Sequence, residues 1–140
     1  MIVALDTNAL VQILGQASDP APIREALRLG RLSLAVSTPI LLEYEEVICR
    51  YADRRRWEDV WSFLTLIASL HGTVHHIGPN YRFHTIIGDA DDDAFADCAI
   101  VAGADWIITS DHHFDVLPGS GYKPQPITPE KFIQQYLAGV

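Results

Sequence analysis

The sequence has little cysteine, few positive charges and no long apolar run. Only two cysteines occur among 140 residues, Cys49 and Cys98, so we expect two core thiols and no disulfide framework. The longest apolar segment, WSFLTLIASL at 61–70, is too short to cross a bilayer, and the start MIVALDTN lacks the basic region of a secretory signal. We therefore expect a soluble, cytoplasmic protein with no membrane partner.

Basic residues are scarce and unevenly placed. Ten Lys and Arg stand against eighteen Asp and Glu, which gives a net charge of -8. This balance argues against a broad basic surface for nucleic acid. It is compatible with a metal-dependent enzyme, because a bound ion offsets the charge of acidic ligands. The cluster of Arg50, Arg54, Arg55 and Arg56 is either a solvated helix end or a contact for a phosphate or partner.

Apolar segments alternate with helical patterns along the chain. Short runs at 2–5, 32–36, 74–77, 106–109 and 125–127 predict strands, with helices between most of them. Such alternation favours a parallel sheet that helices cover on both faces. The chain is 49% apolar and has no linker, so we expect a single domain over residues 1–140. The predicted fold is α/β, a three-layer α/β/α sandwich around a central parallel sheet of about five strands.

One predicted helix carries an inward-facing carboxylate. It runs from Pro39 to about Tyr51, and Ser37 or Thr38 can cap it. Its apolar residues follow helical spacing at 40, 44, 47, 48 and 51, and Glu43 shares their face. An inward carboxylate costs free energy unless it is paired or bound to a metal. Glu43 is therefore either bridged to an arginine or functional.

The segment GDADDDAF at 88–95 crowds several aspartates together at the start of another predicted helix. The apolar stripe of that helix falls at 95, 98, 99 and 102, and the helix ends near 103. Asp92 lies on the inward face, whereas Asp93 and Asp97 are expected to face solvent. Asp89 and Asp91 are expected at the cap, where the helix dipole favours negative charge.

Two further aspartates each follow a predicted strand. Asp6 comes directly after 2–5, and Asp111 comes shortly after 106–109. Ligands of open parallel sheets gather at the carboxyl ends of strands, so Asp6 and Asp111 can converge in one cleft with Glu43 and Asp92. Each of the two is equally compatible with a turn that caps the next helix.

Two other kinds of metal site fit the sequence poorly. An EF-hand would need a glycine at Ala94 and a glutamate at Ile100. The pairs His75–His76 and His112–His113 do not have zinc spacing, because adjacent histidines project in different directions. Carboxylate and water ligands suit Mg²⁺ or Mn²⁺ instead.

The chain resembles the PIN-domain nucleases, a family that includes the VapC-type toxins of toxin–antitoxin pairs. The resemblance rests on segments in family order: DTN at 6–8, STPILLEYEEV at 37–47, DADDDAFADCAIVAGADWIITSD at 89–111 and ITPEKF at 127–132. It implies that the acidic metal ligands are Asp6, Glu43, Asp92 and Asp111, and that the supporting residues are Asn8 and Ser110. Asp93 and Asp97 are second choices, since an ungapped count back from Asp111 lands on Asp93.

The same resemblance implies a function. It predicts an endoribonuclease that uses Mg²⁺ or Mn²⁺ to activate water, hydrolyses RNA and leaves a 5′-phosphate and a 3′-hydroxyl. It also predicts a toxin with a small antitoxin protein as partner, and we expect a homodimer. Two alternatives stay open. One is a Mg²⁺-dependent phosphatase or phosphoacceptor on a similar sheet, with phosphate carried on Asp6. The other is a non-catalytic PIN-like module whose acidic residues bind a basic partner.

Overall fold

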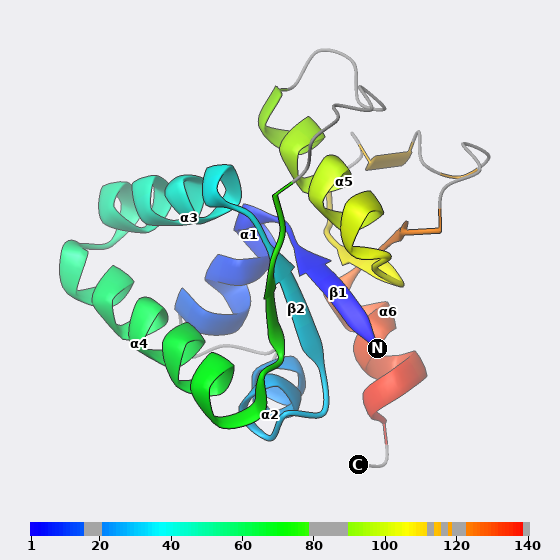
Figure 1. Ribbon diagram of the computed structural model, residues 1–140, viewed down its shortest axis with the longest axis horizontal. Coiled ribbons are helices and arrows are strands. Elements are labelled where there is room, and N and C mark those ends of the chain that lie inside the picture. The colour runs from blue at the N-terminus through cyan, green and yellow to red at the C-terminus, as the bar shows by residue number, and fades with distance from the viewer. Residues whose placement is uncertain (16–20, 79–89, 112–113, 116–117, 119–122, 139–140) are drawn as a thin grey trace.

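The chain folds around a five-stranded parallel sheet (Figure 1). The computed structural model describes residues 1–15, 21–78, 90–111, 114–115, 118 and 123–138, with the backbone alone at 90–93. The strands are β1 (Ile2–Leu5), β2 (Ser33–Val36), β3 (Val74–His76), β4 (Trp106–Ile108) and β5 (Gln125–Ile127). All five predicted strands are confirmed, with ends that differ by one residue at most.

The order of the strands places β1 in the middle of the sheet. The order is β3-β2-β1-β4-β5, and every neighbouring pair is parallel. The chain therefore runs outward from β1 through β2 to β3, and then crosses to the other side of β1 for β4 and β5. Val3, Ala4 and Leu5 of β1 are fully buried, as expected for a strand covered on both faces. The direction of winding reverses between β1 and β4, which is where open parallel sheets form a crevice.

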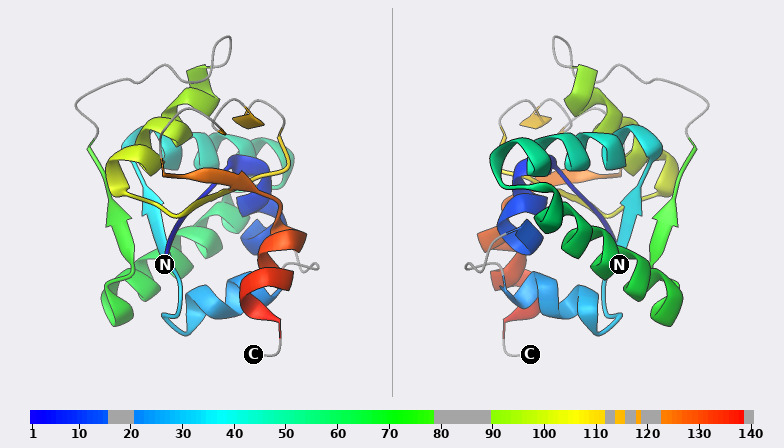
Figure 2. Two further views of the ribbon diagram at one scale, coloured as in Figure 1. Left: turned by 90° about the vertical axis from the view of Figure 1, so that its right-hand side faces the viewer. Right: turned by 90° about the vertical axis from the view of Figure 1, so that its left-hand side faces the viewer.

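Helices complete the sandwich. They are α1 (Thr7–Leu10), α2 (Ala21–Arg28), α3 (Thr38–Tyr51), α4 (Arg54–His71), α5 (Ala90–Ala102) and α6 (Pro129–Phe132), with π-helical turns η1 (Val11–Gly15) and η3 (Ile133–Leu137). Figure 1 shows α5 on one side of the sheet and α1, α2 and α4 on the other. The C-terminal turn η3 contacts α2, and Figure 2 shows the two close together. The predicted α/β/α architecture is confirmed.

Helix α3 begins where the sequence predicts. Ser37 is its N-cap, and the Ser37 hydroxyl oxygen accepts a hydrogen bond from the backbone N–H of Ile40 at 3.4 Å. Ile40, Tyr44 and Ile48 are buried as expected. The prediction was wrong for Tyr51, which is 77% exposed. Tyr51 lies in the final turn of α3, beyond Ile48, where the helix has left the core.

The two cysteines, which were expected to be core thiols, differ in burial. Cys98 is fully buried, and burial raises the pKa of its thiol to about 12, so this thiol stays protonated. Cys49 is only half-buried. Within the part of the chain that the structure describes, no helix combines the length and the apolar character needed to cross a bilayer.

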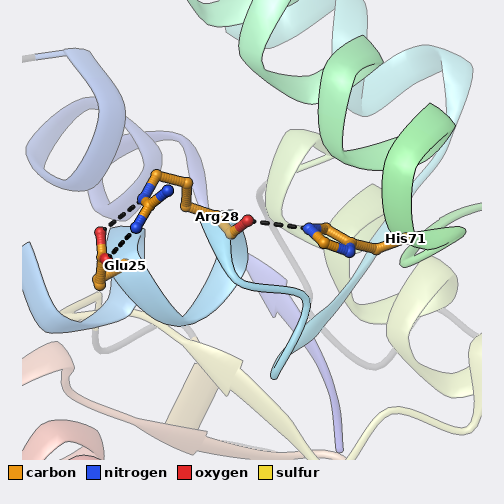
Figure 3. A network of polar contacts seen from close by, with 3 residues as sticks. All are labelled: Glu25, Arg28 and His71. Carbon is orange, nitrogen blue, oxygen red and sulfur yellow. Dashed lines mark hydrogen bonds and ion pairs between the residues drawn. The ribbon is translucent and has the colours of Figure 1, made fainter.

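A tight contact joins the end of α2 to the end of α4. Gly30 has a φ of +73°, in the left-handed region that favours glycine. A Cβ atom at Gly30 would lie 2.6 Å from Cγ of His71. The imidazole is held there because its Nε2–H donates to the backbone oxygen of Arg28 at 2.9 Å (Figure 3). Arg28 also pairs with Glu25 on the surface of α2.

Replacing Gly30 with alanine is expected to destabilise the protein more than the same change at Gly103. Gly103 also has a positive φ, +65°, but a Cβ there would meet nothing within 4 Å. Gly103→Ala should lower the free energy of unfolding by about 1–2 kcal/mol through backbone strain alone. Gly30→Ala should cost about 1–3 kcal/mol more through the collision with His71. Urea unfolding of both variants tests this, and equal losses would show that His71 moves aside freely.

Candidate active site

Asp6 stands between the carboxyl end of β1 and the start of α1. Its Oδ1 accepts a hydrogen bond from the backbone N–H of Ala9 at 2.8 Å, so the side chain caps α1. Its Oδ2 accepts a hydrogen bond from the hydroxyl of Thr109, the residue after β4. The same hydroxyl oxygen accepts from the backbone N–H of Asp111 at 2.9 Å. Asp6 is thus a helix cap, which was one of its two predicted roles. It is also hydrogen-bonded, through Thr109, to the segment that carries Asp111.

The carboxyl group of Asp6 is held in an environment that disfavours its charge. Asp6 is only 4% exposed, and burial raises the pKa of its carboxyl above the ordinary value of 3.8. The hydrogen bonds from Thr109 and Ala9 act in the opposite direction on this pKa, and the nearby charge of Asp111 raises it further. A bound cation would offset both the burial and the repulsion.

A pocket of about 390 Å³ lies where the winding reverses between β1 and β4. It is lined by Asp6, Asn8, Ala9, Val11, Gln12, Ser110 and Asp111. Four of the predicted site residues therefore meet in one place, although they come from two distant segments. They offer two carboxylates, an amide oxygen and a hydroxyl, the oxygen donors that hard divalent cations prefer.

Glu43 is connected to this pocket through Thr7. The hydroxyl of Thr7 donates a hydrogen bond to Oε2 of Glu43 at 2.5 Å. Thr7 follows Asp6 directly in the chain, so the contact brings Glu43 of α3 to the same turn that carries Asp6. Glu43 is half-buried and does not line the pocket itself.

Tyr44, the neighbour of Glu43, fixes α3 against the end of β1. Its buried hydroxyl donates to the backbone oxygen of Leu5 at 2.5 Å. Its ring packs on Phe95 of α5, with ring centroids 6.0 Å apart. Burial raises the pKa of the Tyr44 hydroxyl well above its ordinary value, so the group remains a hydrogen-bond donor. These contacts fix the part of α3 that carries Glu43 next to Leu5, the residue that precedes Asp6.

The aspartates of the segment GDADDDAF lie at the limit of what the structure describes. Asp89 and the side chains of Asp91, Asp92 and Asp93 fall outside the described residues. The backbone at 90–93 belongs to α5, as predicted for Asp92 and Asp93, whereas Asp91 was expected at the cap and lies inside the helix. The choice of Asp92 over Asp93 as a site residue therefore stays a prediction.

The position of Asp97 corrects the sequence analysis. It was expected to face solvent, but it is only 6% exposed. Helix α5 contacts β1, β2, β4 and α3, so every residue from 95 to 99 is buried. Because α5 is covered on several sides at residues 95–99, it has no single buried face there. The angular position of Asp97 relative to Phe95 therefore did not predict its exposure. Burial of a carboxylate requires a compensating contact, which keeps Asp97 among the supporting candidates.

The sequence analysis missed three residues of this arrangement. Thr109 and Thr7 orient Asp6 and Glu43, and Gln12 lines the pocket. A threonine at the end of an apolar strand, next to a candidate acid, is a signal that could have indicated Thr109. Gln12 lies four positions after Asn8, which places the two on one helical face. That spacing could have indicated Gln12.

The histidines of the described residues are not grouped as zinc ligands. Within the described residues, no group of three or more His, Cys, Asp or Glu side chains is arranged to hold a metal ion. The Nε2 atom of His76 lies 3.1 Å from the hydroxyl oxygen of Thr38. His112 and His113 fall outside the described residues. The side chains at 90–93, which include the predicted ligand Asp92, also lie outside the described residues.

The fold and the pocket define a class of protein with a parallel α/β sheet and an acidic site at its switch point. A family model described as PIN domain matches residues 2–113. The chain therefore belongs to the PIN-domain family, as its motifs predicted.

Two solved structures share the fold. One is the crystal structure of VapBC2 from Rickettsia felis bound to a DNA fragment from their promoter, with a TM-score of 0.60 and 18% identity over 90% of this chain and 98% of that chain. The other is the structure of VapBC-1 from nontypeable Haemophilus influenzae, with a TM-score of 0.56 and 17% identity over 93% and 99% of the two chains. A comparison with curated proteins gave no match. The two structural likenesses concern the fold.

Proposed function

We propose that the protein is a divalent-metal-dependent endoribonuclease and the toxin of a toxin–antitoxin pair. The observation that carries the proposal is the meeting of Asp6 and Asp111 with Asn8 and Ser110 in one pocket at the switch point of the sheet. Membership of the PIN-domain family supports a nuclease. The likeness in fold to VapBC structures supports a small antitoxin protein as partner. The homodimer expected from the sequence is part of the same proposal.

The residues that are present fit Mg²⁺ or Mn²⁺. Asp6 and Asp111 would hold the ion, with Glu43 and Asp92 as the remaining proposed ligands. Bound there, the ion supplies a water of lowered pKa and stabilises negative charge on the phosphate. The raised pKa of Asp6 supports this assignment, because its charged form lacks a compensating positive charge among the contacts that set that pKa.

The chain's own residues would position the reacting groups. The hydroxyl of Thr109 orients Asp6, and Thr7 orients Glu43. Asn8 and Ser110 offer an amide and a hydroxyl to phosphate oxygens that enter the pocket. Glu43 or Asp92 would orient the attacking water and accept its proton, and the leaving 3′-oxygen would take up a proton from solvent water as the bond to phosphorus breaks.

The phosphatase alternative is less consistent with the site. It requires Asp6 as a nucleophile that carries the phosphate. Both carboxylate oxygens of Asp6 already accept hydrogen bonds, and the residue is almost completely buried. A nucleophile needs an unobstructed line of approach to phosphorus, so this geometry favours a ligand role for Asp6.

Incubation of the purified chain with single-stranded RNA and Mn²⁺ is expected to give cleavage products with a 5′-phosphate. Excess EDTA should stop the reaction, and added Mn²⁺ should restore it, because the oxygen donors act through the ion. Gel analysis of end-labelled RNA measures the cleavage. Activity that persists in EDTA would indicate a contaminating ribonuclease. Phosphate trapped on Asp6, without RNA cleavage, would favour the phosphatase.

A further inference from the structure

A second pocket adjoins the candidate active site. It has a volume of about 530 Å³ and lies between α1, η1 and the junction of α3 with α4. Asn8 and Val11 line both this pocket and the acidic one, so the two are neighbours that share a wall. The other residues that line it are Val47, Ile48, Tyr51, Ala52 and Arg56. We call it the side groove.

The lining of the side groove combines apolar side chains with the exposed residues Tyr51 and Arg56. Val11, Val47 and Ile48 are among the apolar residues of the lining. Tyr51 is 77% exposed, so most of its ring is available for contact. Arg56 is the charged residue of the lining, and the ion pairs found among the described residues do not include it.

The other arginines of the cluster differ from Arg56. Arg50 pairs with Glu46 at 2.6 Å and Arg54 pairs with Glu45 at 3.8 Å, both on the surface. These pairs agree with the solvated helix end that was one of the two predicted roles. Arg55 is exposed and does not line the side groove. The cluster therefore places one arginine, Arg56, beside the candidate active site.

We propose that the side groove binds a nucleotide of single-stranded RNA next to the scissile phosphate, with its base on Tyr51 and a flanking phosphate on Arg56. The proposal rests on the proposed nuclease function, because it extends the same substrate out of the acidic pocket past Asn8. Base stacking on an aromatic ring tolerates any base, and a guanidinium matches the geometry of phosphate oxygens. The base must be unpaired to enter, so the proposal selects single-stranded RNA.

Arg56 makes the side groove locally cationic, in contrast to the chain as a whole. The chain has a net charge of -8, and the acidic pocket by itself repels phosphates. The side chain of Arg56 therefore gives a phosphate-bearing chain a local anchor beside the acidic pocket, which favours RNA as the occupant. The amphipathic helix of a protein partner, or a second copy of this chain, is the competing occupant.

The test is the binding of a labelled single-stranded RNA oligonucleotide to the full chain in EDTA, where metal-dependent cleavage does not occur. Tyr51→Leu should weaken binding about 10-fold because it removes the stacking surface, and Tyr51→Phe should bind like the wild type. Arg56→Gln should also weaken binding and should lower the slope of log K against log salt by about 0.7, the value for one phosphate contact on a single strand. Arg55→Gln is the matched control and should change neither quantity.

The outcomes separate this inference from the proposed function. If wild type binds no RNA, or if Tyr51→Leu and Arg56→Gln bind like Arg55→Gln, the side groove is not an RNA site, whatever the cleavage assay shows. If the two variants weaken binding but wild type never cuts RNA, the groove stands and the nuclease assignment fails. A change in sedimentation of Tyr51→Leu without a change in RNA binding would make the groove a protein interface and overturn the inference.

Discussion

Asp6→Asn is expected to abolish metal-dependent RNA cleavage, with a loss of roughly 100-fold or more. The substitution keeps the shape of the side chain and an oxygen that can cap α1 through Ala9. It removes the negative charge that would hold the ion beside Asp111. The measurement is the rate of RNA cleavage at saturating Mn²⁺, compared with wild type.

The same variant should be at least as stable as wild type in the absence of metal. Burial raises the folded-state pKa of Asp6 above 3.8, so the folded protein binds this proton more tightly than the unfolded chain does. Asp6 therefore disfavours folding at neutral pH, and this penalty fades as pH falls through the raised pKa toward 3.8. In EDTA, the melting temperature of Asp6→Asn should exceed that of wild type most at neutral pH and least in acid.

Added Mn²⁺ distinguishes a ligand from a structural cap. It should raise the melting temperature of wild type, because an ion that binds only the folded state stabilises it. Asp6→Asn should lose this increase. Asp59→Asn is the matched control, since Asp59 is exposed on α4 and outside the pocket. An Asp6→Asn protein that still cuts RNA and still responds to Mn²⁺ would remove Asp6 from the proposed site.

Asp92→Asn is expected to abolish cleavage, whereas Asp93→Asn should keep most of the activity. Asp92 precedes Phe95 by three positions and Ala99 by seven, and both of these residues are buried on α5. That spacing places Asp92 on their side of the helix. Replacing its carboxylate would remove a ligand charge without a change of shape. Cleavage rates of the two variants at saturating Mn²⁺ measure the difference.

The burial of Asp97 is the reason to compare Asp93→Asn with Asp92→Asn. Asp93 lies one helical turn before Asp97, on the same side of α5, and that side is covered at Asp97. Thermal unfolding of each variant should match wild type in EDTA, as a check that the fold is kept. If Asp93→Asn is the inactive variant, the ungapped spacing from Asp111 was the better guide. Full activity of both variants would leave GDADDDAF as a charged helix start.

Some features of the protein follow from short stretches of sequence. The apolar run before Asp6 predicted β1, and Ser37 with Pro39 predicted the start of α3. These features depend on backbone geometry, capping and the alternation of apolar residues, which act over a few positions and are therefore readable in order along the chain. The family followed from motifs in a fixed order for the same reason.

The tertiary structure alone decided how these pieces meet. The hydroxyl of Thr109 reaches Asp6 across 103 positions, and it does so because β4 pairs with β1 on the side opposite to β2. Local patterns predicted the strands but not their order. The exposure of Tyr51 and the burial of Asp97 were also predicted wrongly, because a helical stripe shows which residues share a side and not what covers that side. That coverage depends on the packing of elements that are distant in the sequence.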